Sequence, residues 1–311
     1  MDVKPCTAVI GAGLIGRSWA IVFAGGGCDV ALYDSNAGVA ERARGLVMEG
    51  LADLAKHGLV ADAETAHARV RVCATLTDAL EGATFVQENT PESIEAKREI
   101  FAELDRLAAP NTILASSTST IVASQFTEGL IGRHRCLVAH PVNPPHLVPL
   151  VELVAAPWTA PATVTQAKAI YEAVGQVPIV VNREIEGFIL NRLQAVLLSE
   201  AFRLVENGYV TPQDLDKTLK DGLGLRWSFM GPFETVELNA PGGIPDYCRR
   251  YGPSLARLSG AEPDIYRTPD LDLILRQWGK QLSPEQIAER MRWRDRRLAA
   301  LKAHKRSQSA G

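Results

Sequence analysis

The stretch "VIGAGLIGRSWA", residues 9–20, decides how the chain begins to fold. It sets Gly11, Gly13 and Gly16 in a G-x-G-x-x-G pattern between an apolar run, which predicts a strand, and a predicted helix that ends near Gly25. In that setting the first glycine permits a tight turn, the second lets the backbone approach a pyrophosphate, and the third allows the helix to pack closely on the strand. The pattern therefore predicts a dinucleotide-binding turn.

The residues around the glycines favour this interpretation over a bare glycine turn. Leu14 and Ile15 open the predicted helix, where unpaired N–H groups attract phosphate. The next apolar run, "CDVALYD", predicts a strand that ends in Asp34, 23 residues after Gly11. An acidic side chain there accepts hydrogen bonds from the ribose hydroxyls and repels a 2′-phosphate, so we expect NAD as the cofactor rather than NADP.

The rest of the chain predicts an α/β fold followed by helices. The apolar runs "ATFVQEN", "TILASSTS", "RCLVAHPV" and "VPIVVNR" predict further strands separated by helical segments, a pattern typical of a Rossmann-type, mostly parallel sheet. Residues 184–208 then show helical spacing that predicts one long buried helix ending near Gly208. Thr211 with Pro212 predicts the start of another helix. We expect an NAD-binding domain over residues 1–183 and a smaller, all-helical domain over residues 184–311, which would carry the substrate cleft.

Composition excludes several classes of protein. The 33 basic and 36 acidic residues give a net charge of −3, which argues against a protein built to hold nucleic acid. Five scattered cysteines, odd in number and without a C-x-x-C pair, predict reduced thiols. The first residues lack the pattern of a secretory leader, and no run approaches the roughly 18 apolar residues of a membrane span. We therefore expect a cytoplasmic protein with no membrane partner.

One histidine stands out as a candidate catalytic base. His140 ends the apolar run "CLVAH" and opens "HPVNPP", and the carboxyl ends of strands in open α/β sheets face the ligand crevice. Histidine suits proton transfer because it titrates near neutral pH. Glu152, in "PLVELV", is twelve positions further on and would orient the imidazole as a partner. The alternative places Glu152 on the solvent face of an edge strand, and spacing alone does not separate the two.

Several motifs together resemble one known family. The segments "VIGAGLIG", "YD", "SSTST", "HPVNPP", "PLVELV" and "GFILNRL" follow the order found in the L-3-hydroxyacyl-CoA dehydrogenase superfamily, from residue 8 to about residue 250. The resemblance implies that His140 is the general base and that Glu152 orients it. It further implies that Ser119 and Asn191 bind the reacting oxygen or position the pair.

The same resemblance implies contacts for the cofactor and the substrate. Glu92 and Lys97, in "PESIEAK", match positions that contact the nicotinamide end of NAD, and Asn143 of "HPVNPP" is a candidate substrate contact. Within the superfamily, "GRSWA", "LVELV" and "ETVELNAPGG" resemble the branch of lambda-crystallin and L-gulonate 3-dehydrogenase.

Departures from the acyl-CoA enzymes argue against a CoA substrate. Ser117 stands where those enzymes usually have asparagine, and Pro141 with Val142 replaces their aromatic pair. CoA phosphates need basic side chains. Residues 45–70, the segment that supplies them in that family, contain only Lys56 and Arg69 as bases.

A small hydroxy acid instead needs its carboxylate held. Arg226, in "GLGLRWSFMGPFE", is our candidate for that role, although it equally fits an arginine that is structurally paired or solvated. The segment "LRWSFMG" also resembles L-carnitine dehydrogenase. Trp227 and Phe229 would stack on its quaternary ammonium if they are not core residues.

These observations lead to one hypothesis and its alternatives. No histidine pair has the spacing of a metal site on a helix face, and no G-x-S-x-G hydrolase elbow occurs. We expect an NAD-dependent dehydrogenase that oxidises the 3-hydroxyl of a small hydroxy acid, with L-gulonate first. L-carnitine and L-3-hydroxyacyl-CoA are the alternatives, and a non-catalytic, crystallin-like NAD-binding protein is the alternative of another class. The apolar "GFILNRLQAVLLSEAF" fits a homodimer interface, or equally a domain core.

Overall fold

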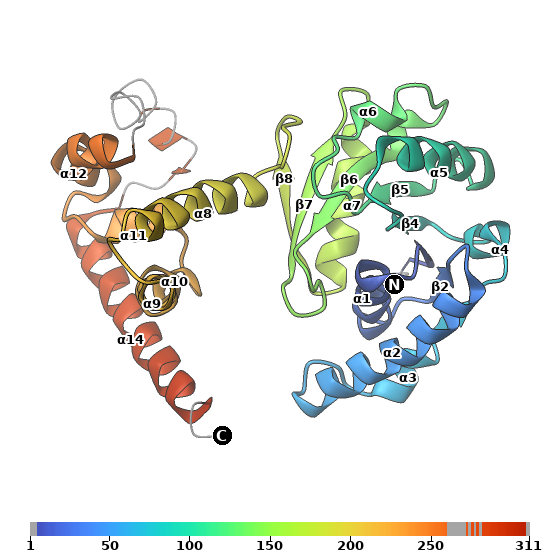
Figure 1. The fold of residues 1–311 in the computed structure, drawn as a ribbon, viewed down its shortest axis with the longest axis horizontal. Coiled ribbons are helices and arrows are strands. Elements are labelled where there is room, and N and C mark those ends of the chain that lie inside the picture. Colours follow the sequence, from blue (N-terminus) through green and yellow to red (C-terminus); the bar gives the residue numbers. More distant parts are fainter. Residues whose placement is uncertain (1–4, 260–271, 273–274, 277, 280–281, 309–311) are drawn as a thin grey trace. The chain divides into compact units, whose positions relative to one another are not determined.

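The computed structural model describes residues 5–259, 272, 275–276, 278–279 and 282–308. The chain divides into two compact units, Met1–Leu197 and Leu198–Gly311. The first contains a sheet with helices and the second is helical, which confirms the predicted fold class (Figure 1). The chain crosses from one unit to the other inside helix α8 (Leu190–Glu206). The predicted domain boundary between residues 183 and 184 stays a prediction.

The first unit is built on one sheet of eight strands in the order β3-β2-β1-β4-β5-β6-β7-β8. Only the pair β6 and β7 is antiparallel, and all the other neighbours are parallel. The strands are β1 (Thr7–Ile10), β2 (Val30–Tyr33), β3 (Val70–Val72), β4 (Phe85–Glu88), β5 (Ile113–Ser116), β6 (Cys136–Pro141), β7 (Leu150–Ala155) and β8 (Val177–Val181).

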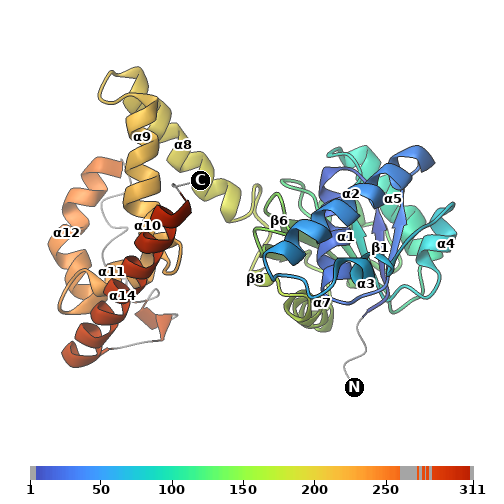
Figure 2. The ribbon, with the colours of Figure 1, turned by 90° about the horizontal axis from the view of Figure 1, so that it is seen from below.

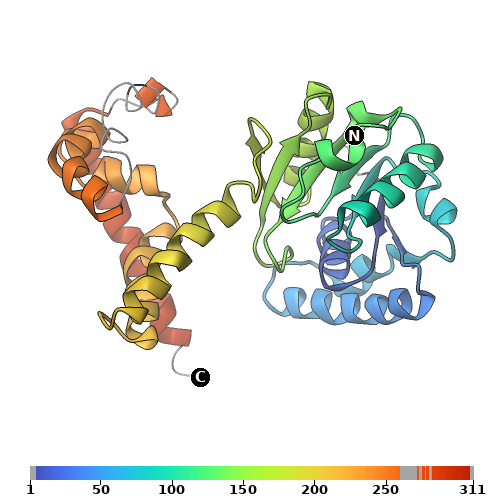
Figure 3. The ribbon, with the colours of Figure 1, turned by 45° about the horizontal axis from the view of Figure 1, so that its top comes forward.

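Helices cover both faces of this sheet (Figures 2 and 3). They are α1 (Leu14–Gly25), α2 (Ala37–Lys56), α3 (Ala63–His67), α4 (Leu76–Leu80), α5 (Ile94–Leu107), α6 (Ser124–Thr127) and α7 (Pro161–Ala173). Alternate strand residues point to opposite faces, so Val9 joins an apolar cluster with α1, α2 and α7. Its neighbours Ala8 and Ile10 join a second cluster with α4, α5 and α6. The two clusters hold the sheet from both sides.

Three details differ from what the sequence predicts. The helix expected over residues 184–208 begins only at Leu190, and none of the residues of α8 is buried. β7 is an internal strand between β6 and β8, and Glu152 has no exposed surface, so the edge-strand alternative for Glu152 is wrong. β3 is not among the predicted strands, because its three residues are too short to show a period.

The topology gathers the candidate site residues along the carboxyl-terminal edge of the sheet, where the parallel strands end. The carboxyl ends of parallel strands meet at the same edge, where Gly11 follows β1, Asp34 follows β2, Asn89 follows β4 and Ser117 follows β5. β6 ends there with His140 as its fifth residue. The antiparallel β7 begins at that edge, which lets it supply a partner to His140 from the neighbouring strand.

The second unit is formed by helices that follow α8. They are α9 (Pro212–Thr218), a π-helical turn (Leu219–Leu223), α10 (Gly224–Trp227), α11 (Pro232–Leu238), α12 (Gly243–Ser259) and α14 (Pro284–Gln308). Thr211 is the N-cap of α9, with its side chain accepting from the Asp214 N–H, as predicted. Met230, Leu238 and Ile287 form the centre of a small apolar cluster. Within the part of the chain that the structure describes, no helix is long and apolar enough to cross a bilayer.

Candidate active site

The three glycines of the first turn have three different surroundings. Gly11 has a φ of +87°, and a Cβ there would lie 2.8 Å from the carbonyl oxygen of Asn89. A Cβ on Gly16 would lie 1.8 Å from the carbonyl oxygen of Gly11. A Cβ on Gly13, in contrast, would meet nothing within 4 Å. Two glycines therefore serve internal packing, and Gly13 borders open space where a pyrophosphate would approach the backbone.

The start of α1 leaves its amide groups available to a ligand. Gly13 is the N-cap and has no side chain, so no side-chain cap hydrogen bond forms there. Leu14 is half exposed and Ile15 is partly exposed in the first turn. The first N–H groups of a helix lack partners within the helix and carry its positive dipole end. This arrangement suits an anionic phosphate.

Asp34 lies beside the glycine turn and lines a pocket next to it. Its Oδ2 accepts a hydrogen bond from the Ala12 N–H at 2.8 Å, and its Oδ1 accepts from the Asn36 N–H at 2.9 Å. A pocket of about 490 Å³ lies beside it. Its lining includes Gly11, Gly13, Tyr33, Asp34, Asn89 and Thr90. The carboxylate, the open side of Gly13 and the helix start together fit the adenosine and pyrophosphate parts of NAD.

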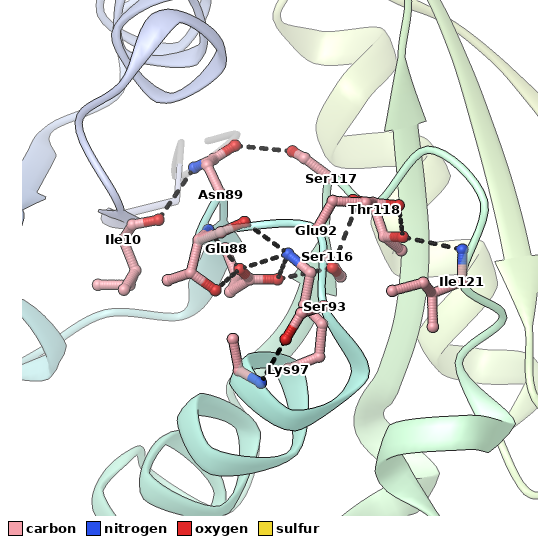
Figure 4. A network of polar contacts seen from close by, with 12 residues as sticks. Ile10, Glu88, Asn89, Glu92, Ser93, Lys97, Ser116, Ser117, Thr118 and Ile121 are labelled. Carbon is pink, nitrogen blue, oxygen red and sulfur yellow. Dashed lines mark hydrogen bonds and ion pairs between the residues drawn. The ribbon is translucent and has the colours of Figure 1, made fainter.

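A buried ion pair holds the segment that carries Thr90, one of the residues that line this pocket. Lys97 Nζ lies 2.8 Å and 3.0 Å from the two carboxylate oxygens of Glu88 and 2.9 Å from the carbonyl oxygen of Thr90. Ser116 Oγ donates to the same carboxylate at 2.6 Å. Figure 4 shows how these groups join α5 and the ends of the neighbouring strands β4 and β5. The three ammonium protons of Lys97 therefore have acceptors within the protein, and its contact with the nicotinamide stays a prediction.

Glu92 ties together the turn that carries Ser119. Its Oε1 accepts from Thr118 Oγ1 at 2.6 Å; Figure 4 labels both residues. The same oxygen accepts from the Ser119 N–H at 2.9 Å and from the Thr120 N–H at 3.1 Å. Burial alone would raise the pKa of Glu92, but these hydrogen bonds, with the charge of Lys97, outweigh burial and lower it. Glu92 thus stays ionised and holds the 118–120 turn.

Ser117 belongs to a polar network that the sequence does not predict. Its Oγ donates to Asn89 Oδ1 at 2.7 Å and accepts from Gln87 Nε2 at 2.8 Å and Trp19 Nε1 at 3.0 Å. The buried Tyr171 hydroxyl donates to Gln87 Oε1. This network ties α1 and α7 to the pocket edge. Only the unusual serine in "SSTST" marks it in the sequence, since Trp19 and Ser117 are 98 positions apart.

The structure brings His140 and Glu152 together. They face each other in the antiparallel register of β6 and β7, and His140 Nδ1 lies 2.8 Å from Glu152 Oε2. The other carboxylate oxygen, Oε1, accepts from the Ile189 N–H at 2.8 Å and the Leu190 N–H at 3.0 Å. Burial would raise the pKa of Glu152, but the hydrogen bonds from His140 and from the two amides lower it. Such an ionised partner fixes the imidazole orientation.

Ser119 and Asn191 are joined at the same edge of the first unit. Asn191 Nδ2 donates to the Ser119 carbonyl oxygen at 2.9 Å, and the Ser119 side chain is exposed. Asn143 is exposed in the loop after β6, where a cis peptide bond joins it to Pro144. Asn191 therefore connects α8 to the turn that Glu92 holds.

Phe188 is a second residue that sequence reasoning missed. It is fully buried, its ring centroid lies 5.3 Å from that of His140, and its backbone has a φ of +48°. A bulky residue rarely adopts that conformation. The "GF" pair lies inside the stretch predicted to be helical and just before the observed start of α8, and it is the only signal for this turn in the sequence.

Arg226 lies on α10, in the second unit, and is partly exposed. Its neighbour Trp227 is 41% exposed, whereas Phe229 packs edge-to-face on Trp293. Phe229 thus contributes to the small core of that unit, while the substrate contact of Arg226 stays a prediction. In the described residues, no three His, Cys, Asp or Glu side chains are grouped to hold a metal ion.

Two consecutive parts of this chain match models of known protein domains. The family model of the 3-hydroxyacyl-CoA dehydrogenase NAD binding domain matches residues 6–185, and that of the 3-hydroxyacyl-CoA dehydrogenase C-terminal domain matches residues 187–269. The chain belongs to the 3-hydroxyacyl-CoA dehydrogenase family. It is therefore an NAD-dependent dehydrogenase that acts on a CH–OH group.

Individual relatives cover nearly the whole chain. Lambda-crystallin of Oryctolagus cuniculus is 41% identical over 305 residues, 94% of this chain and 95% of the relative. L-carnitine dehydrogenase of a Pseudomonas species is 36% identical over 296 residues, 94% and 92% of the two chains. Among solved structures, the chain is similar to 5-formyl-3-hydroxy-2-methylpyridine 4-carboxylic acid 5-dehydrogenase, an NAD⁺-dependent dismutase. The TM-score is 0.74 and the identity 30%, over 95% of this chain and 96% of the other.

Proposed function

We propose that this dehydrogenase oxidises the 3-hydroxyl of a small hydroxy acid to the 3-keto acid, with L-gulonate as its substrate. The observation that carries the proposal is the buried contact of 2.8 Å between His140 and Glu152, at the sheet edge that also holds Ser119 and the glycine turn. A dehydrogenase of this kind needs a base beside the alcohol, and an imidazole oriented by an ionised carboxylate supplies one.

Each residue of the site would have its own role in the reaction. His140 accepts the hydroxyl proton, and Glu152 stabilises the imidazolium that forms. Ser119 and Asn191 position the reacting oxygen, and Asn143 contacts the substrate. When NAD is bound, it takes up the hydride that leaves the same carbon. Gly11, Gly13, Gly16 and Asp34, with the start of α1, hold the cofactor, and Glu92 and Lys97 support its nicotinamide end.

The substrate class rests on the departures from acyl-CoA enzymes. Ser117 is fully engaged within the protein by Asn89, Gln87 and Trp19. Residues 45–70 carry only Lys56 and Arg69 as bases for CoA phosphates, and these are paired with Asp53 and Asp29. Arg226 is our candidate for holding the substrate carboxylate. The similarity to lambda-crystallin favours the sugar-acid branch.

L-carnitine is the second candidate substrate. It is favoured by the similarity to L-carnitine dehydrogenase and by the exposed Trp227, whose ring could stack on a quaternary ammonium. An L-3-hydroxyacyl-CoA is the third. A non-catalytic, crystallin-like NAD-binding protein is the alternative of another class, which the retained pair of His140 and Glu152 disfavours.

We also propose that the enzyme is a homodimer. α8 exposes several large apolar side chains, and contiguous exposed apolar surface is typical of protein interfaces. The most exposed are Leu193, Val196 and Phe202.

The experiment that tests the proposed function is a comparison of substrates. Initial NADH formation is measured at about 1 mM NAD with L-gulonate, L-carnitine, L-3-hydroxybutyrate and L-3-hydroxybutyryl-CoA. We expect the highest kcat/KM for L-gulonate. A higher kcat/KM for L-carnitine or the CoA ester would assign that compound as the substrate in place of L-gulonate. NADH formation with none of the four would favour the non-catalytic alternative.

A substitution of the base provides the control for mechanism. We expect His140→Ala to lower kcat with the best substrate by about 10²- to 10⁴-fold and to leave the Kd for NAD unchanged. Equal losses of turnover and NAD affinity would contradict the assignment of His140 as the base.

A further inference from the structure

The turn that precedes α8 contacts both members of the His140–Glu152 pair. The Ile189 and Leu190 N–H groups donate to Glu152 Oε1, while the Phe188 ring packs beside the His140 ring. These three residues are consecutive, and α8 begins at Leu190. One short segment therefore holds the carboxylate through its backbone and the imidazole through a side chain.

The backbone of this turn is unusual. Gly187 and Phe188 both have positive φ angles, +71° and +48°. Two consecutive residues in this region turn the chain sharply, and the next two amides then point at one carboxylate oxygen. Glycine would adopt this conformation without strain, so a fully buried phenylalanine there indicates that its ring has a role.

Hydrogen bonds from the protein take the place of water around the carboxylate of Glu152. Its side chain has no exposed surface, and its described partners are His140 on one oxygen and the two amides on the other. A buried carboxylate remains ionised only when hydrogen bonds replace water. The amides at the start of α8 also carry the positive end of that helix dipole.

We propose that the 187–190 turn positions the base: Phe188 fixes the plane of the His140 ring, and the Ile189 and Leu190 amides fix Glu152. The same turn leads directly into α8, the helix along which the chain leaves the first unit (Figure 1). The inference rests on the proposed role of His140 and Glu152. Phe188 and Leu190 act through these two groups and are positioning residues.

The test uses two pairs of matched variants. Phe188→Leu removes the ring beside His140, and Phe101→Leu makes the same change at another fully buried phenylalanine of the same apolar cluster. Leu190→Pro removes one amide donor to Glu152 at the first helical position, where proline is tolerated. Leu190→Ala loses the side chain and keeps that amide.

The decisive measurement is made on the protein without NAD. Histidine labelled with ¹⁵N gives a hydrogen-bonded Nδ1–H resonance, assigned to His140 by its loss in His140→Asn. We expect this resonance to shift or broaden in Phe188→Leu and Leu190→Pro, and to stay in place in Phe101→Leu and Leu190→Ala. We further expect kcat to fall about 10- to 100-fold in the first two variants, with the KM for NAD unchanged.

Two results would overturn the inference. One is an unchanged His140 resonance in both Phe188→Leu and Leu190→Pro, and the other is an equal change in Leu190→Ala and Leu190→Pro. If Phe188→Leu does not fold, the Leu190 pair alone decides. Because the resonance is read without turnover, a failure of the proposed function shows instead in the comparison of substrates or as full activity in His140→Ala.

Discussion

At the scale of the residue, Glu152 shows how a buried charge is kept ionised. Each of its oxygens is engaged, one by His140 Nδ1 and the other by two backbone amides. Burial works against ionisation, and the three hydrogen bonds more than offset it, so the pKa of Glu152 lies below that of an ordinary glutamate. The residue therefore contributes to folding as well as to the site.

The lowered pKa predicts how the stability depends on pH. Ionised Glu152 stabilises the fold above the pKa of an unfolded glutamate, about 4.3, and this contribution is lost as the pH falls through the lower pKa of the folded state. We expect Glu152→Gln to lower the free energy of unfolding by roughly 1–3 kcal/mol at pH 7. The difference from the wild type should shrink below about pH 4.3.

Urea unfolding of both proteins at pH 7, 5 and 4 measures this difference. A loss of stability that stays constant over the three pH values would contradict the prediction, because it would come from packing alone.

At the scale of the element, the turn between β1 and α1 separates packing from ligand binding. Gly16 lies against the Gly11 carbonyl, whereas the space beside Gly13 is open. The G-x-G-x-x-G spacing predicts glycine at both positions. Only the structure shows that an added methyl group would clash with the backbone at Gly16 and not at Gly13. The sequence also predicts α1 from Leu14 to Gly25, as observed, because strand, glycines and helix are contiguous there.

Two alanine substitutions distinguish these roles. We expect Gly13→Ala to change the free energy of unfolding by less than about 0.5 kcal/mol while raising the Kd for NAD at least about tenfold, since the methyl group would enter the pyrophosphate space. Gly16→Ala should destabilise the fold by roughly 1–3 kcal/mol, because its methyl group meets backbone. Thermal unfolding and fluorescence titration with NADH measure the two effects. Unimpaired NADH binding by Gly13→Ala would place the cofactor elsewhere.

At the scale of the whole molecule, local patterns predict much of the fold and only part of the site. The fold class, most strands and the start of α9 follow from apolar runs and capping residues. The network around Ser117 does not, because it joins residues from α1, β4 and α7 that are far apart in the sequence. The backbone of Phe188 was equally unpredictable, since a positive φ at phenylalanine goes against local preference and depends on tertiary packing.

The proposed homodimer is also tested at this scale. α8 exposes 73% of Val196, and a charge there would oppose burial in an interface. We expect Val196→Glu to shift the mass measured by light scattering after size exclusion from a dimer to a monomer. Gln194→Glu adds the same charge at another exposed position of α8 and should leave the dimer intact. A monomeric wild type, or a dimeric Val196→Glu, would contradict the proposal.

The hydrogen bond of 2.8 Å from the Ala12 amide to Asp34 bears on redesign of the coenzyme preference. The acidic side chain that we expect to repel a 2′-phosphate also fastens the glycine turn to the end of β2. Exchanging it for a basic residue, or for a neutral residue without a side-chain oxygen at that reach, would release that fastening in the same step. A variant that changes coenzyme would therefore need a replacement acceptor for the Ala12 amide, and asparagine, which keeps an oxygen at that reach without the charge, is the conservative first choice.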